Sequence, residues 1–308
     1  MKILRWLVAL FLPCALLALS GCNGSSSASD NATLNLYVAD TPVDNAAHVN
    51  IVFTGVEVQG GYGNSGGMMG SGSGTSGPLV FDFATPKNID LMAQQGGNSA
   101  ALLSGATLPA GNYQWIRLKI DPAQCTITLS DGSVHPLIIP SGSQTGLKLV
   151  SGFTMAAGQM ANFTIEFNLR RSVTMANGGY MMSPAMRMMN NQQVGSIDGS
   201  VSNTLSIGNV PVSDPACSPA VYIYSGSNVT PVDINTTSSV QPVTTESLTL
   251  NTTTGNYDYD VAYLATGTYT LAITCAANDD PSQADALAFS AAKTATVTAG
   301  QTTEVDFP

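Results

Sequence analysis

The chain has 308 residues, of which only 10% are charged, and its 10 lysines and arginines against 20 aspartates and glutamates give a formal net charge of −10. Nucleic-acid binding requires clustered lysine and arginine, so this balance argues against such a partner. Threonine, serine, glycine and asparagine abound and long helical periodicities are absent, so we expect an all-β protein.

The first 21 residues have the features of a secretory signal peptide. Lys2 and Arg5 give a positive end, and residues 6–19 are almost wholly apolar, over a length below the roughly 20 residues of a membrane-spanning helix. The LSGC segment that ends at Cys22 resembles the lipobox of bacterial lipoproteins. The resemblance implies cleavage before Cys22, lipid on its sulfur and palmitate-type acylation of its new amino group, which together anchor the chain stably in a membrane.

Two further features concern the anchored chain. Asn23 stands where inner-membrane retention would usually show aspartate, so the lipoprotein resemblance implies the outer membrane, with the periplasmic or cell-surface face left open. Residues 22–33 are rich in serine and are expected to be a tether. Without its leader the chain carries 8 basic and 20 acidic residues, a formal charge of −12.

Residues 34–190 are expected to form a first β-sandwich domain. Short runs of alternating apolar and polar residues are separated by glycine, proline, asparagine and aspartate, a pattern typical of strands and turns. The expected strands lie within residues 34–40, 49–59, 79–83, 112–121, 125–140, 146–155 and 160–169. The pair Asp131-Gly132 predicts a hairpin turn, and Asp40, next to Thr41-Pro42, is interpreted as a turn residue.

Residues 196–308 are expected to form a second β-sandwich domain. Its predicted strands lie within residues 195–201, 220–226, 247–252, 256–261, 267–275 and 294–307. The charge changes with the pattern, because the segment from 30 to 190 holds 7 basic and 9 acidic residues, whereas the segment from 196 to the end holds 1 and 11. The second domain is therefore the acidic one.

One short motif occurs once in each half. Gly111-Asn112-Tyr113 and Gly267-Thr268-Tyr269 both place Gly-x-Tyr at the entrance of a strand. Because nothing else repeats at a fixed period, we interpret the motif as two sandwiches that use the same corner. Ile116, Leu118 and Ile120 are expected to face the first core, and Leu271 and Ile273 the second.

Three cysteines remain in the chain besides Cys14 of the leader and Cys22. Strand alternation places Cys217 and Cys275 toward one core, so we predict a disulfide between them, although sequence alone leaves the connectivity open. Cys125 is expected to be a buried free thiol.

Two stretches of the chain resemble known families. The segments NLYVADTPVD, LPAGNYQWIRLKID and GFTMAAGQMANFTIEFNLRRSV, followed by MMSPAMRM, are similar to domain of unknown function 4382, found in bacterial and archaeal lipoproteins. This sequence departs from that family in a glycine-rich insertion at 60–77 and in EFN at 166–168, where the family tends to show a second acidic residue. The segments IDGSV, TTTGNYDYDV, LATGTYTLAITC and TVTAGQTTEVDF resemble the carboxypeptidase-regulatory-like modules of the transthyretin-like group.

Motifs that would indicate catalysis are weak. Ser65 fits G-x-S-x-G and Gly72 to Gly77 fit a dinucleotide fingerprint, but both lie in a glycine-rich stretch without the strand and helix that those sites need. His48 and His135 are the only histidines, without metal-ligand spacing. We predict a protein that is not an enzyme and has no cofactor, with a hydrolase as the least favoured alternative.

Metal binding has two candidate segments. Five methionines crowd into residues 181–189 and two more, Met68 and Met69, lie in the glycine-rich stretch, which suits Cu(I), although Met182, Met186 and Met188 share strand parity and suit a core. Oxygen-bearing side chains for Ca²⁺ are Asn278, Asp279, Asp280 and Asp285, and a solvated acidic loop is favoured for them. We predict no metal, with envelope copper handling as the second hypothesis.

The preferred function is binding or scaffolding of a glycan or an envelope protein. Tyr113, Trp115 and Arg117 alternate on the face opposite Ile116 and Leu118, so an aromatic ring and a cation are predicted to stand side by side on the surface. Burial of the same ring under a neighbouring sheet or the glycine-rich stretch is the alternative.

Overall fold

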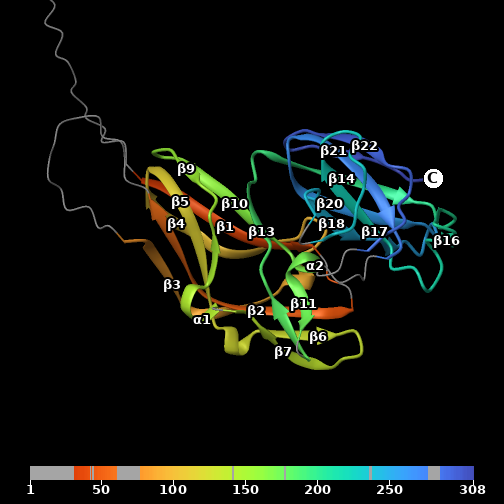
Figure 1. Ribbon diagram of the computed structural model, residues 1–308. Coiled ribbons are helices and arrows are strands. Elements are labelled where there is room, and N and C mark those ends of the chain that lie inside the picture. Colours follow the sequence, from red (N-terminus) through yellow and green to blue (C-terminus); the bar gives the residue numbers. More distant parts are fainter. Residues whose placement is uncertain are drawn as a thin grey trace, which may run out of the picture.

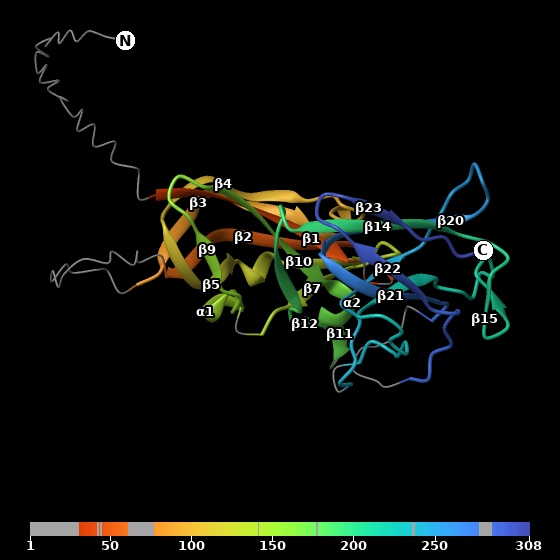
Figure 2. The ribbon, with the colours of Figure 1, turned by 90° about the horizontal axis from the view of Figure 1, so that it is seen from above.

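The computed structural model describes residues 31–308 except residues 42, 44, 61–76, 141, 177, 236–237 and 277–284. The described residues form two β-sandwiches that lie next to each other (Figure 1). Figure 2 shows the same arrangement from above, with the C terminus at the end of the second sandwich that points away from the first. The predicted all-β class with two sandwiches is confirmed.

The first sandwich consists of a four-stranded and a nine-stranded sheet. The smaller sheet has the order β13 (Met186–Asn190), β10 (Met160–Asn168), β1 (Asn31–Thr41) and β4 (Ala100–Pro109). The larger sheet runs β11 (Val173–Ala176), β12 (Gly179–Met182), β7 (Val134–Ile138), β6 (Thr126–Leu129), β2 (Ala46–Gly60), β5 (Gly111–Ile120) and β8 (Leu147–Leu149), with β3 (Leu79–Asp90) paired to β2 and β9 (Phe153–Met155) to β5. Short helical turns are η1 (Leu91–Ala93), η2 (Pro122–Gln124), α1 (Gly142–Thr145) and α2 (Leu169–Ser172).

Alternation determines which residues fill this core. In β1 the even positions Leu34, Leu36 and Val38 are fully buried, and in β5 Ile116 and Leu118 are buried as expected. Burial of such side chains is the main source of stability, at about 25 cal/mol per Å² of apolar surface. β1 begins at Asn31, inside the predicted tether, and β4 was not predicted from the sequence, because its residues do not alternate cleanly.

The second sandwich consists of two four-stranded sheets and a small ribbon. One sheet has the order β19 (Thr249–Leu250), β20 (Tyr257–Ala265), β14 (Val194–Val201) and β23 (Thr302–Glu304), and the other has β18 (Thr244–Ser247), β17 (Ala220–Ser225), β21 (Gly267–Thr274) and β22 (Lys293–Val297). The ribbon is β15 (Ser206–Ile207) with β16 (Val210–Pro211). Leu271 and Ile273 face the core as predicted, opposite Ile197 and Val261 of the other sheet.

Both Gly-x-Tyr motifs form the same corner. The Tyr113 hydroxyl donates to the Pro109 carbonyl at 2.7 Å, and the Tyr269 hydroxyl donates to the Ala265 carbonyl at 2.7 Å. Each bond spans four residues, as in the tyrosine corner of immunoglobulin-like sandwiches. The glycines that precede the rings have φ of 149° and 159°, which side chains with a Cβ rarely adopt. The interpretation of one corner used twice is confirmed.

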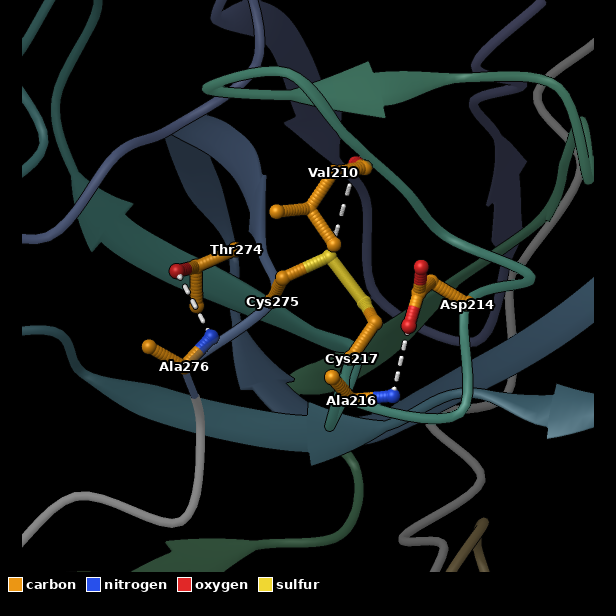
Figure 3. Close-up of a disulfide and its surroundings, with 7 residues drawn as sticks. All are labelled: Val210, Asp214, Ala216, Cys217, Thr274, Cys275 and Ala276. Atoms are coloured by element: carbon orange, nitrogen blue, oxygen red, sulfur yellow. Dashed lines mark hydrogen bonds between the residues drawn. A yellow bond between two sulfur atoms is a disulfide. The ribbon is translucent and has the colours of Figure 1, made fainter.

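The predicted disulfide is present. Cys217 and Cys275 are bonded, with their Cα atoms 4.6 Å apart, and the bond ties the turn after β16 to the end of β21 (Figure 3). Cys125 is a buried free thiol as predicted, and burial raises the pKa of that thiol. The Asp131-Gly132 turn also forms, because β6 and β7 pair as a hairpin around it.

Candidate functional site

Polar side chains join the two sandwiches. Arg170, in α2 of the first sandwich, is 1% exposed and extends its guanidinium to the edge strand β18 of the second. Its Nη1 donates to Thr245 Oγ1 at 2.8 Å, and its Nη2 donates to Ser247 Oγ at 3.2 Å. A buried guanidinium is tolerated only where its donors find acceptors, so these hydroxyls hold the two sandwiches in register.

Glu166 forms the second link between the sandwiches. Its register partner on β13 is Arg187, whose Nε donates to Glu166 Oε2 at 2.7 Å and whose Nη2 also contacts that oxygen. Thr244 Oγ1, from β18, donates to Oε1 at 2.9 Å. Burial raises the pKa of Glu166, whereas Arg187 and the Thr244 hydroxyl lower it. Both carboxylate oxygens therefore have partners, one from each sandwich.

Asp40 and Glu246 bring two more carboxyl groups to the same place. Asp40 is 4% exposed and neither of its oxygens makes a hydrogen bond of good geometry, although the backbone amides of Leu169 and Thr41 lower its pKa. Burial, followed by the charges of Glu246 and Glu166, raises the Asp40 pKa well above its usual value. The interpretation of Asp40 as a turn residue is wrong, because it belongs to β1 and is buried at the junction.

Glu246, on β18, is 7% exposed. Burial raises its pKa well above the usual value, and Arg170 opposes this rise. We call Asp40, Glu166 and Glu246 the junction carboxylates. They line a cavity of about 10 Å³, which is roughly the volume that one water-sized group needs.

A much larger pocket adjoins this cavity. It has a volume of about 620 Å³, shares Gly96 and Glu246 with the cavity, and is lined by residues of both sandwiches. We call it the acidic pocket, after its six carboxylates: Asp198, Glu246, Asp258, Asp260, Glu304 and Asp306. No lysine, arginine or histidine is among its lining residues in the described part of the chain.

Strand register explains how the acidic pocket arises. Asp198 on β14 lies directly opposite Asp260 on β20 and, on its other side, opposite Glu304 on β23. Three carboxylates therefore stand in one row across neighbouring strands, an arrangement that is unfavourable without a counter-charge. Burial, followed by the Asp198 charge, raises the pKa of Asp260. Interdomain position, volume and shifted pKa values are typical of ligand sites.

The three residues of the predicted surface site do not share one environment, because Tyr113 is buried whereas Trp115 and Arg117 are not. Tyr113 is 2% exposed and stacks on Phe153, so the prediction that it lies beside Trp115 on the outer face is wrong. The pairing of β5 with β2 is irregular here, because Gln59 pairs with Trp115 but Gly60 pairs with Tyr113. The alternation of inward and outward side chains along β5 therefore shifts between Tyr113 and Trp115. Trp115 itself is half-buried, and both it and Arg117 face outward.

Two cations lie on Trp115. The Arg117 guanidinium carbon is 4.9 Å from the ring centroid and the Lys148 ammonium is 4.5 Å from it, both within cation–π distance. Arg117 is also paired with Glu57 at 2.8 Å, whereas the exposed Lys148 makes no ion pair in the described part of the chain. An aromatic ring and a cation therefore stand together on the outer face of the nine-stranded sheet.

The methionine cluster contributes to the core. Met182 is fully buried on β12, and Met186 and Met188, on β13 of the other sheet, pack against the same core. Their sulfurs are thus not gathered on one surface. Among the described residues, no group of three histidine, cysteine, aspartate or glutamate side chains is arranged to hold a metal ion.

The histidines lie outside the junction. His48 Nδ1 is 2.7 Å from Asp90 Oδ2, and His135 Nε2 is 3.1 Å from Ser133 Oγ, which itself donates to Asp131 at 2.6 Å. In a catalytic triad the histidine stands between serine and acid, whereas here the serine stands between them. The arrangement therefore does not activate Ser133.

Several predicted features lie outside the described residues: the leader and Cys22, Ser65 and the other glycine-rich motif, Met68, Met69, and the Asn278 to Asp280 part of the calcium hypothesis. Within the described chain, no helix combines the length and apolar character needed to cross a membrane.

Comparison with solved structures gives distant similarities. The minor pilin of Streptococcus agalactiae aligns over 89% of this chain and 94% of its own, at 10% identity and a TM-score of 0.18. A candidate cell adhesion protein from Bacteroides ovatus aligns over 89% and 91%, at 10% identity and a TM-score of 0.22. Candidate polysaccharide-binding proteins from Bacteroides thetaiotaomicron align over 80% and 78%, at 11% identity and a TM-score of 0.17.

The comparison of sequences is more informative. No curated protein matches the chain. A family model described as domain of unknown function (DUF4382) matches residues 31–184, half of the chain. Asp40, Glu166 and Arg170, which form the first sandwich's side of the junction, all lie within that match. The chain belongs to the DUF4382 family.

Proposed function

We propose that this protein is a non-catalytic, lipid-anchored binding module of the cell envelope, and that it binds a carboxylated glycan at Trp115. The observation that carries the proposal is the placement of the Lys148 ammonium and the Arg117 guanidinium on the half-exposed Trp115 ring. The apolar face of a sugar packs on an aromatic ring, and a carboxylate accepts hydrogen bonds from an ammonium or guanidinium.

Charge supports the same ligand class. The chain without its leader is strongly acidic, so an anionic glycan is repelled by most of the molecule and needs a local concentration of cations. Arg117 and Lys148 are register partners on β5 and β8, which places both cations in one row beside the ring. Lys148 is exposed and is free to take a carboxylate, whereas Arg117 is partly engaged by Glu57.

The anchor is a separate part of the proposal. The lipobox-like segment before Cys22 supports acylation, and Asn23 after it supports an outer-membrane location. Metabolic labelling with a palmitate analogue should label the wild-type chain and fail to label Cys22→Ser. A labelled Cys22→Ser protein, or an unlabelled wild-type protein in the soluble fraction, would refute the anchor without touching the glycan site.

The fluorescence of Trp115 can report ligand binding at the glycan site. Of the two tryptophans, Trp6 lies in the leader, so Trp115 is the sole tryptophan of the processed chain. Titration of the processed chain carrying Cys22→Ser with oligogalacturonate should change its tryptophan emission saturably. Its neutral counterpart, an oligogalactoside, should have little effect.

Variants separate specific binding from general attraction. Lys148→Ala should weaken oligogalacturonate binding by roughly ten- to a hundredfold, since a charge-assisted hydrogen bond contributes about 1.5–3 kcal/mol. The control is Lys87→Ala on β3, which removes the same charge from a lysine that contacts the Phe83 ring and two backbone carbonyls. Equal weakening by the two variants, or binding without any change in emission, would overturn the proposal.

A further inference from the structure

We propose that the acidic pocket between the two sandwiches binds a linear polyamine, one of whose terminal ammonium groups enters the cavity at the junction carboxylates. This second site is independent of the glycan proposal, because none of its lining residues belongs to the Trp115 region.

The charges of the acidic pocket are compensated by few groups. Asp258 accepts from the Asn251 amide at 2.7 Å, and Asp306 accepts from the Ser200 backbone at 2.8 Å, but both donors are neutral. Asp198, Asp260 and Glu304 have no cationic partner in the described part of the chain and face one another across three strands. Like charges directly opposite each other weaken strand pairing, so a bound cation would reduce the repulsion among these carboxylates.

Asp40 is the independent indication of a ligand. It is 4% exposed, lines the small cavity behind the pocket, and neither of its oxygens makes a hydrogen bond. Buried polar atoms in native proteins nearly always have a partner, and an exception indicates a missing water, ion or ligand. Gly96 and Glu246 line both spaces, so the cavity that Asp40 lines adjoins the acidic pocket at Glu246.

A primary ammonium group matches this inner cavity. It presents three donors and no acceptor, whereas the cavity is bordered by three carboxyl groups. Its volume of about 10 Å³ admits one water-sized group. Glu166 is already bonded to Arg187 and Thr244, and the Arg170 guanidinium lies close enough to Glu246 to lower its pKa. Asp40 is therefore the acceptor that remains for an incoming ammonium.

The acidic pocket favours a ligand with several separated positive charges over a single ion. Neighbouring strands lie about 4.8 Å apart, so the row Asp260, Asp198 and Glu304 spreads its charge over two such intervals. Among the described residues no three such groups converge as metal ligands, which disfavours Ca²⁺. The volume of about 620 Å³ lies within the range of small-molecule pockets, which favours a flexible molecule with several ammonium groups over a folded partner.

Calorimetric titration of the processed chain carrying Cys22→Ser with spermine, at low and at physiological salt, tests the proposal. We expect saturable binding of one spermine per chain that weakens with salt but persists. Asp198→Asn should weaken spermine binding about tenfold, or by about 1.4 kcal/mol, because it removes one of the charges that attract the ammonium groups. The same variant should fold normally, because it removes a repulsion from the strand row.

Two further variants make the test specific. Asp214→Asn removes one charge from an exposed turn of the same sandwich, outside the pocket, and keeps the oxygen that accepts from the Ala216 amide, so it should leave binding unchanged. Asp40→Asn should weaken the binding of spermine and of the shorter putrescine alike, because each ends in the primary ammonium group that the inner cavity holds. Equal loss in Asp198→Asn and Asp214→Asn, displacement of spermine by equimolar Ca²⁺, or tighter binding of a lysine-rich peptide than of spermine would each overturn the proposal.

Discussion

The Arg170 guanidinium of the first sandwich donates to Thr245 Oγ1 of the second at 2.8 Å, across a sequence separation of 75 residues. This bond and the one from Thr244 to Glu166 connect both sides of a junction that is polar and buried. Such a junction is held by specific partners rather than by apolar area, so its stability depends on individual side chains.

Arg170→Ala should destabilise the protein by about 3–5 kcal/mol, because it leaves the Glu246 charge and two hydroxyls buried without the guanidinium. The free energy of unfolding from urea denaturation measures this loss. The control is Arg171→Ala on the next residue of α2, whose side chain is half-buried and makes no bond to the second sandwich in the described part of the chain. A similar loss in both variants would show that the helix, and not the junction, is affected.

The junction carboxylates predict an unusual pH dependence. The pKa values of Asp40 and Glu246 are raised well above their usual values in the folded state, so the folded protein binds more protons than the unfolded chain. The contribution of Asp40 and Glu246 to the free energy of unfolding is therefore fully present below their usual pKa of about 4. It is lost as pH rises through their folded pKa values. Asp40→Asn should flatten this slope in urea midpoints measured from pH 4 to 8.

Asp131 provides a control of opposite sign. Hydrogen bonds from the Ser133 side chain and backbone lower the pKa of Asp131, so its contribution is present above the usual pKa and is lost as pH falls. Asp131→Asn should therefore lower the urea midpoint above the usual aspartate pKa of about 4 and leave it nearly unchanged at lower pH. A wild-type protein whose stability rises steadily from pH 4 to 8 would contradict the assignment at Asp40.

The disulfide should contribute about 4 kcal/mol, as the chain-entropy estimate gives for a bond between residues 58 apart. Cys217→Ala with Cys275→Ala, compared with wild type in urea, measures it. In the processed chain carrying Cys22→Ser, which lacks Cys14, thiol titration without reductant should find no reactive thiol in the folded protein and one, Cys125, in denaturant. Three thiols in denaturant without reductant would show that the bond does not form.

The two tyrosine corners should behave alike. Tyr113→Phe and Tyr269→Phe should each lower the free energy of unfolding by about 1 kcal/mol, the usual contribution of one hydrogen bond. The losses should add in the double variant, because the rings lie in separate cores. Tyr37→Phe is the control, since its hydroxyl makes no hydrogen bond in the described part of the chain. No loss in either corner variant would argue against the motif as a stabilising device.

Part of the site could be predicted from the sequence. Alternation in β1 places Leu34, Leu36 and Val38 inward, and continuing it by two residues places Asp40 inward as well, but the following Thr41-Pro42 suggested a turn. The sequence of β5 does not indicate that Tyr113 is buried. The irregularity lies in the pairing of β5 with β2, and the pattern of a single strand does not reveal it. The acidic bias of the second half was visible, whereas its concentration in one pocket was not.

The sequence by itself determined the β class, the inward faces of most strands, the corner motif and the disulfide, because each depends on patterns within a few residues or on the parity of one strand. Only the tertiary structure decided the junction and the acidic pocket. Asp40, Glu166 and Glu246 are far apart along the chain. Their proximity depends on the parallel pairing of β1 with β10, on the packing of β18 against β1, and on the hydrogen bond from Thr244 of β18 to Glu166 of β10. Interactions of this kind are set by strand register and by the docking of two sandwiches, and local periodicity carries no information about either.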